Sequence, residues 1–182
     1  SIKWYDSATA GTLYTGSETL VTGTYYASQT ENGCESTRTL VNVIIDDTTA
    51  PVIPTLADVT GQCSVTPTAP TTTDACSGTI TGTTTTVFPI TTQGTTVVTW
   101  SFNDGNGQTV TATQNVIIDD TTAPVVPTLA DVTGQCSVTP TAPTTTDACS
   151  GTITGTTSTV FPITAQGTTV VTWSFNDGNG QT

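Results

Sequence analysis

Apolar and polar residues alternate along much of the chain, most regularly between residues 95 and 118. In the segment TTVVTWSF, the side chains of Val98, Trp100 and Phe102 form one face and alternate with those of the other face. After NDGNG, whose residues tolerate a positive φ, the alternation resumes. The second apolar face comprises Val110, Ala112, Val116 and Ile118. This pattern predicts a β-hairpin.

The whole pattern occurs twice in the chain. Residues 42–109 and 115–182 form 68 aligned pairs with a period of 73 residues, and only three pairs differ. The differences are mild: Ile53/Val126, Thr85/Ser158 and Thr92/Ala165. A period of 73 residues is too long for one coil of a solenoid and suits one small domain per repeat.

Each repeat contains several more short apolar segments, and none shows the 3.6-residue period of a helix. In the first repeat they are VIPTLADV (Val52–Val59), QCSVTP, GTITGTT and TVFPI. Glycine, proline and aspartate separate them, and the prolines suit strand starts and edges because they lack an N–H group. Six or seven short strands in a 73-residue repeat predict an all-β chain of tandem immunoglobulin-like β-sandwich domains.

The stretch VIIDDTTAP occurs at Val43–Pro51 and again at Val116–Pro124, and it marks the boundaries between the units. We expect Ile44 and Ile45 to end a buried strand, DDTTA to form a linker and Pro51 to open the next domain. A short linker that ends in proline restricts the angle between domains. We therefore predict an elongated rod of three units, the first and last of them incomplete: residues 1–45, 46–118 and 119–182.

The charge balance excludes several classes of function. Lys3 and Arg38 are the only bases, and the formal net charge is −12. This charge argues against a nucleic-acid partner and against an anionic membrane surface. No apolar run approaches the roughly 18 residues of a membrane-spanning helix. The start, SIKWYDSATAG, does not resemble a signal peptide, so an export signal is expected outside this sequence.

The chain contains no histidine, the commonest general base and metal ligand. A carboxylate pair can serve a glycosidase, but the adjacent Asp46 and Asp47 of an extended linker would point to opposite sides. We therefore expect no enzymatic activity in this segment. Trp100 and Trp173 are expected in the core rather than as sugar-stacking platforms, because both belong to a period-2 apolar face.

Four of the five cysteines recur with the repeat. Because so small a domain has a thin core, we expect a disulfide to support each one. A bond between Cys63 and Cys76 would close a 14-residue loop and stabilise the fold by about 3 kcal/mol. Cys136 and Cys149 would pair in the same way. A metal site needs more ligands than one cysteine pair, and disulfides imply an oxidising compartment such as the periplasm, cell surface or medium.

The acidic linkers and the turn aspartates are candidates for binding Ca²⁺, which takes six to eight oxygen ligands. The candidate ligands are Asp46, Asp47, Asp104, Asp119, Asp120 and Asp177. The turn lacks the complete pattern of an EF-hand loop. In the simpler interpretation the acids keep the linker solvated and the edge strands apart. We predict no firm cofactor, and Ca²⁺ remains a hypothesis.

The segment FPITTQGTTVVTWSFNDGNGQTVTATQNVIIDDTTAP resembles the second half of a hyalin repeat, with its FP-x-GTTTVTYTATDxxGN core and V-x-V-x-D-x-x-x-P linker. TTTDACSG (Thr71–Gly78) is similar to the T-D-N-C-S segment of that family. The resemblance covers nearly all of residues 46–182. It implies immunoglobulin-like extracellular modules associated with adhesion.

The first unit, with IKWYDSATAGTLYTG and TGTYYASQTENGCESTRTLVNVII, is similar to an immunoglobulin-like domain common in secreted proteins of Bacteroidetes. The resemblance implies that Trp4 is the core tryptophan and that Tyr25 and Tyr26 precede the last cysteine, Cys34. It also implies that the disulfide partner of Cys34 lies before Ser1. A free or intermolecular thiol is the alternative.

In tandem, the two unit types resemble the giant repetitive surface adhesins of gliding Bacteroidetes, exported by type IX secretion. The resemblance implies a structural segment of an adhesin filament at the cell surface, attached to the outer membrane and to the motility or anchoring machinery. Other parts of such a protein would bind an external surface or polysaccharide. The alternatives are a passive spacer in a secreted enzyme and a carbohydrate-binding module. Three sites match the O-glycosylation pattern of that phylum, with Thr48, Thr121 and Ser7 as acceptors.

Overall fold

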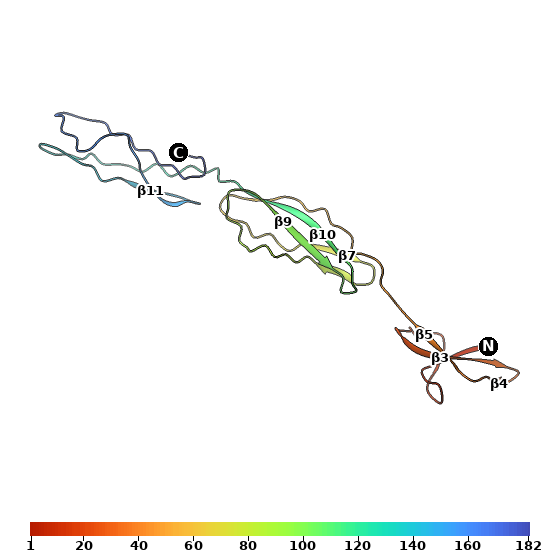
Figure 1. The fold of residues 1–182 in the computed structure, drawn as a ribbon. Coiled ribbons are helices and arrows are strands. Elements are labelled where there is room, and N and C mark those ends of the chain that lie inside the picture. Colours follow the sequence, from red (N-terminus) through yellow and green to blue (C-terminus); the bar gives the residue numbers. More distant parts are fainter. The chain divides into compact units, whose positions relative to one another are not determined.

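The computed structural model describes residues 1–182 and contains strands, turns and extended segments but no helix (Figure 1). The predicted all-β fold class is confirmed. No helix is present that is long and apolar enough to cross a membrane. The chain divides into two compact units: Ser1–Thr49 with Gly105–Gln108, and Ala50–Asp104 with Thr109–Thr182.

The first unit contains five strands arranged around the longest of them, β3 (Gly23–Glu31). β3 pairs antiparallel with its three neighbours, β1 (Ile2–Tyr5), β4 (Cys34–Glu35) and β5 (Thr39–Val43). β2 (Leu13–Tyr14) pairs with the other edge of β1.

Aromatic packing holds this sheet, and it corrects one expectation from the sequence. Tyr5 and Tyr25 are buried, whereas Trp4 is only partly buried, because neighbouring residues of β1 face opposite sides of the sheet. The guanidinium carbon of Arg38 lies 3.3 Å from the centre of the Tyr5 ring. This contact is a cation–π interaction.

The hairpin predicted from the alternating pattern is present in the first repeat. β9 (Gly94–Asn103) and β10 (Thr109–Ile118) pair antiparallel along their whole length, and they lie side by side in Figure 1. β6 (Val59–Gly61) adds to the other edge of β10 in parallel. Gly105 and Gly107 adopt positive φ in the connecting turn, which is the conformation that the NDGNG sequence predicts.

The remaining strands are shorter than the apolar segments predicted. β7 (Thr71–Asp74) and β8 (Gly78–Thr81) form a second hairpin. The expected strand Val52–Val59 is regular only at its last residue, and QCSVTP and TVFPI meet in a single bridge between Val65 and Ile90. Prolines within or beside these segments remove N–H donors, so long ladders cannot form.

One hydrophobic core fills the first repeat, and the inward faces of β9 and β10 supply most of it. Trp100 is only 2% exposed, which confirms its predicted place in the core. Gly82 allows β8 and β9 to approach, because a Cβ at this position would lie 2.8 Å from Phe102 Cε1. The buried members of the core are Ile80, Ile90, Val98, Trp100, Phe102, Ala112, Val116 and Ile118.

The second repeat keeps the local elements of the first. β11 (Thr144–Asp147) and β12 (Gly151–Thr154) form the counterpart of the β7–β8 hairpin. Residues 167–176, the equivalent of β9, do not form a regular strand, and Ser174 pairs in a single bridge with Thr156. A cavity of about 500 Å³ lies between the counterparts of β6 and β9, lined by residues that include Ile163, Val171 and Trp173.

The end of the first unit departs from the expectation. Ile44 and Ile45 were predicted to end a buried strand, but β5 stops at Val43 and the two side chains are 77% and 62% exposed. Ile118, the equivalent of Ile45 in the first repeat, is only 1% exposed. The difference arises because β10 pairs with β6 and β9 as far as Ile118, whereas the pairing of β5 with β3 ends at Val43.

Candidate functional site at the repeat junction

The linker between the two repeats is held by one buried aspartate. Asp120 follows β10 directly and is only 1% exposed. Its backbone N–H donates to Gln93 Oε1 of the first repeat at 3.0 Å. Asn179 and Gln181 of the second repeat donate to its side-chain Oδ2 and its backbone O, at 2.9 and 2.7 Å. Asp120 therefore connects side chains of both repeats.

The NDGNGQ sequence positions these two donors. Asp177 Oδ1 accepts the backbone N–H groups of Asn179, Gly180 and Gln181 at 2.8 to 3.1 Å. This ring of bonds is an extended Asx turn, which winds the loop around the carboxylate. The NDGNG turn, predicted to connect the two strands of a hairpin, thus also carries the side chains that bind the linker.

The same arrangement occurs in the first unit. Asn106 Nδ2 donates to Asp47 Oδ2 at 3.0 Å, and Gln108 Nε2 donates to the Asp47 backbone O at 2.8 Å. Of each Asp-Asp pair, the first residue, Asp46 or Asp119, is exposed. The interpretation that both acids only keep the linker solvated is therefore wrong for Asp47 and Asp120, because these two carboxylates accept specific side-chain donors.

The first repeat contributes two glutamines to the junction. Thr122 Oγ1 donates to Gln62 Oε1 at 2.5 Å, and Gln93 Nε2 donates to the backbone O of Gln62 at 3.1 Å. The N–H of Asp119 bonds to the O of Gly61 at 2.9 Å, which continues the pairing of β6 into the linker. The linker is thus bonded along its length rather than loose.

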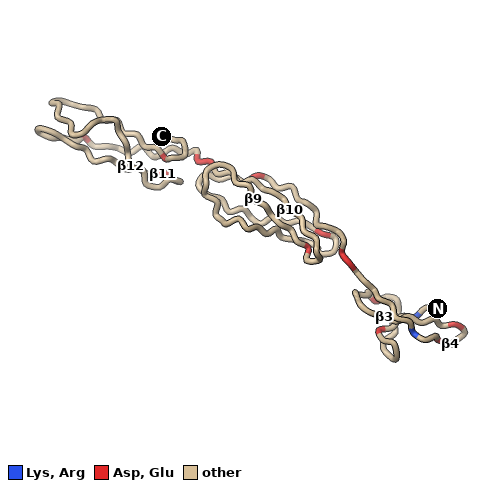
Figure 2. Tube along the Cα trace, viewed as in Figure 1, with Lys and Arg blue, Asp and Glu red and all other residues tan.

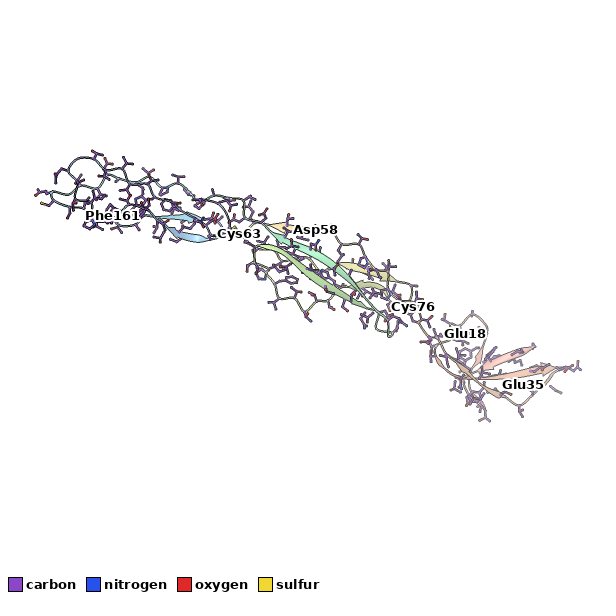
Figure 3. The ribbon with its side chains drawn as sticks, turned by 45° about the horizontal axis from the view of Figure 1, so that its top comes forward. Glu18, Glu35, Asp58, Cys63, Cys76 and Phe161 are labelled. Atoms are coloured by element: carbon purple, nitrogen blue, oxygen red, sulfur yellow. A yellow bond between two sulfur atoms is a disulfide. The ribbon has the colours of Figure 1, made fainter.

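A disulfide joins the two repeats, and it corrects the predicted pairing. Cys63 bonds to Cys149, 86 positions away, instead of to Cys76. Cys63 and Cys76 lie at opposite ends of the first repeat, as Figure 3 shows. Cys63 follows β6 at the end beside the linker, and Cys149 lies in the β11–β12 turn. The predicted Cys136–Cys149 bond is also excluded, because Cys149 is bonded to Cys63. Cys136 and Cys34 are exposed and form no disulfide within residues 1–182.

Beside this disulfide lie two buried acids. Carboxylate oxygens of Asp120 and Asp147 and the Cys149 sulfur all lie within 4.8 Å of one another. Asp147 Oδ1 accepts the N–H groups of Cys149 and Ser150, each at 2.8 Å. These donors, that of Ser150 most strongly, lower the pKa of Asp147. The sequence analysis predicted Asp120 as a cation ligand but not Asp147. The only sequence feature that singles out Asp147 is its position in the TTTDACSG segment.

No base neutralises this acidic pair. The two basic residues of the chain, Lys3 and Arg38, lie in the first unit, where Figure 2 shows the blue segments. Residues 50–104 and 109–182 contain eight aspartates and no lysine or arginine.

The remaining candidate residues lie in the turns, the linkers and the first unit. Asp104 and Asp177 are buried in their turns. Of the three hydroxyls that match the glycosylation pattern, those of Thr48 and Thr121 belong to exposed residues, and Ser7 is partly buried and donates to the Thr9 backbone O. Trp173, which was also expected in the core, is only partly buried, and its ring makes a tilted contact with Phe161, with ring centres 6.0 Å apart.

Comparison with known families supports the immunoglobulin-like assignment for the first unit. The family model described as "Ig-like domain CHU_C associated" matches residues 1–46. Among curated proteins and solved structures, none matches the chain significantly. The chain thus contains a segment similar to an immunoglobulin-like domain, followed by two all-β repeats.

Proposed function

We propose that this chain is a structural repeat segment of an extracellular bacterial adhesin, a filament that mediates surface attachment and gliding motility. In this proposal the repeats are hyalin-like modules that extend a binding region away from the cell. They need no catalytic group. The parent protein reaches the outer surface by the type IX route and binds a surface or polysaccharide through other parts.

The observation that carries the proposal is the junction between the repeats. Its linker is bonded to both repeats, and the Cys63–Cys149 disulfide adds a covalent connection between them. A chain that only has to keep two modules apart can use a flexible linker. A chain that transmits a pull from one module to the next benefits from bonds across the joint.

Three further features support the same proposal. The match of residues 1–46 to an immunoglobulin-like family is consistent with a structural module. The disulfide favours an oxidising compartment, as expected outside the cytosol. The negative charge of the repeats favours solubility and keeps neighbouring filaments apart.

Imaging of live source cells tests the proposal. An antibody raised against one 73-residue repeat would be labelled and followed by fluorescence microscopy, with pre-immune antibody as the control. Label that travels along the surface of moving cells is the expected result. Label that stays fixed on the cells would remove the role in motility. Label found only in the medium would overturn the adhesin assignment altogether.

A further inference from the structure

The acidic pair beside the inter-repeat disulfide has an unused ligand atom. Asp147 is 8% exposed, and its Oδ2 is buried without any hydrogen-bond partner. A buried polar atom that makes no hydrogen bond costs roughly 1–3 kcal/mol, and more when it is charged, so such an atom in a folded protein indicates a missing partner, either an ordered water or an ion.

The second acid lies close to the first. An oxygen of Asp120 lies within 4.8 Å of an oxygen of Asp147. Asp120 Oδ1 accepts the N–H of Thr122 at 3.1 Å, and Oδ2 accepts Asn179 Nδ2 at 2.9 Å. Each carboxylate oxygen has two lone pairs, so these single bonds leave Asp120 able to accept a further partner.

The charges point to a cation as that partner. Two carboxylates at this separation repel each other, and burial strengthens the repulsion. No lysine or arginine occurs in residues 50–104 or 109–182. The feature is not an accident of one copy, because Asp74, the equivalent of Asp147 in the first repeat, also has a buried Oδ2 without a hydrogen-bond partner.

The donor atoms decide which cation fits. The chain has no histidine, and the sulfur of Cys149 is engaged in the disulfide. The site therefore provides neither an imidazole nor a thiolate ligand, the groups that zinc and copper prefer. The available donors are the carboxylate oxygens of Asp120 and Asp147. Ca²⁺ accepts such oxygens in irregular arrangements and completes its shell with water, whereas Mg²⁺ requires a near-ideal octahedron.

We propose that the second repeat binds a calcium ion between Asp120 and Asp147, with Asp147 Oδ2 as the principal ligand. The ion joins the linker to the β11–β12 turn, next to the covalent bond to the first repeat. Calcium therefore tightens the joint at the point where the two repeats are already connected.

Calorimetric titration of the 182-residue chain with CaCl₂ tests this site, with Asp147→Asn as the variant. Extracellular calcium modules have dissociation constants of roughly 10⁻⁴ to 10⁻³ M, so the titration covers this range. The asparagine keeps Oδ1 as an acceptor for Cys149 and Ser150 and replaces only the unpartnered oxygen. Asp131→Asn, an exposed site in the same repeat, is the matched control.

We expect D147N to bind one equivalent of Ca²⁺ fewer than the wild type, or to bind it about tenfold or more weakly. D131N should match the wild type. Equal Ca²⁺ binding by wild type and D147N, or no binding to either, would overturn the proposal.

A second measurement does not depend on the variant. Amide resonances of Cys149 and Ser150 report on the Asp147 carboxylate, because both N–H groups donate to its Oδ1. They should shift when CaCl₂ is added to the wild-type chain, and those of the exposed Asp131 should not. Unchanged Cys149 and Ser150 resonances would contradict the site.

Discussion

The indole Nε1 of Trp100 donates a 3.0 Å hydrogen bond to Oε1 of Gln114, 14 residues away on the neighbouring strand. Gln114 lies on the inward face of β10, and its Nε2 donates a second hydrogen bond to the backbone O of Ala57 at 3.0 Å. A polar side chain thus lies within the apolar core with both ends of its amide satisfied. Such a residue is tolerated because none of its polar atoms is left without a partner.

Replacing Gln114 with leucine should therefore destabilise the first repeat although it makes the core more apolar. The change leaves the Trp100 N–H and the Ala57 carbonyl without a hydrogen-bond partner. The expected loss in free energy of unfolding is about 1–3 kcal/mol. Denaturant unfolding followed by tryptophan fluorescence measures it. The exposed neighbour Thr113→Val is the control and should change stability by about 0.5 kcal/mol or less.

Non-reducing peptide mapping should recover a fragment that links Cys63 to Cys149. In the chain-entropy model, closing so long a loop stabilises the fold by about 4.6 kcal/mol. Reduction should then lower the melting temperature by roughly 10 °C or more. Cys136→Ser should melt like the wild type. Recovery of Cys63–Cys76 and Cys136–Cys149 fragments would contradict the inter-repeat bond.

Asn179→Ala should loosen the linker without touching the core. The substitution removes the donor to the buried carboxylate of Asp120, and hydrogen bonds to charged groups contribute about 1.5–3 kcal/mol. Asn176 lies in the same turn with an exposed side chain, and Asn176→Ala should cost about 1 kcal/mol or less. Thermal unfolding of the two variants compares them, and equal costs would argue that Asp120 needs no partner.

The first unit should lose stability in acid through Glu18. Its carboxylate accepts the N–H groups of Thr15 and Gly16 and the Thr15 hydroxyl, and these bonds lower the pKa of Glu18 from 4.5 to about 2. Because the folded pKa is the lower one, the contribution is complete above pH 4.5 and is lost as the pH falls toward 2. NMR titration of the Glu18 carboxyl measures the pKa, and a midpoint near 4.5 would refute the contribution of these hydrogen bonds.

Local features of this fold could be predicted from the sequence. The alternation of Val98, Trp100 and Phe102 and the glycines of NDGNG act over a few residues, so the hairpin and its buried face followed directly. The short strands beside prolines were overestimated, because apolar composition does not replace the missing N–H groups.

Interactions across the junction could not be predicted in the same way. Asn179 and Asp120 are 59 residues apart, and no local pattern indicates that the turn reaches back to the linker. The cysteines show the same limit. The nearest partner in sequence for Cys63 is Cys76, yet the two lie at opposite ends of the repeat, and the identical residue of the next repeat is the one within reach.

The Cys63–Cys149 bond also decides which part of the polypeptide can be stretched. If the chain is pulled from its two ends, the pull passes from Cys63 directly to Cys149, so residues 64–148 form a side loop that is not strained. That loop includes the long β9–β10 hairpin of the first repeat. At about 3.5 Å per residue, the 86-residue separation withholds roughly 300 Å of contour length. The oxidised chain therefore cannot release this length under a pull, and reduction turns the same sequence into a longer tether.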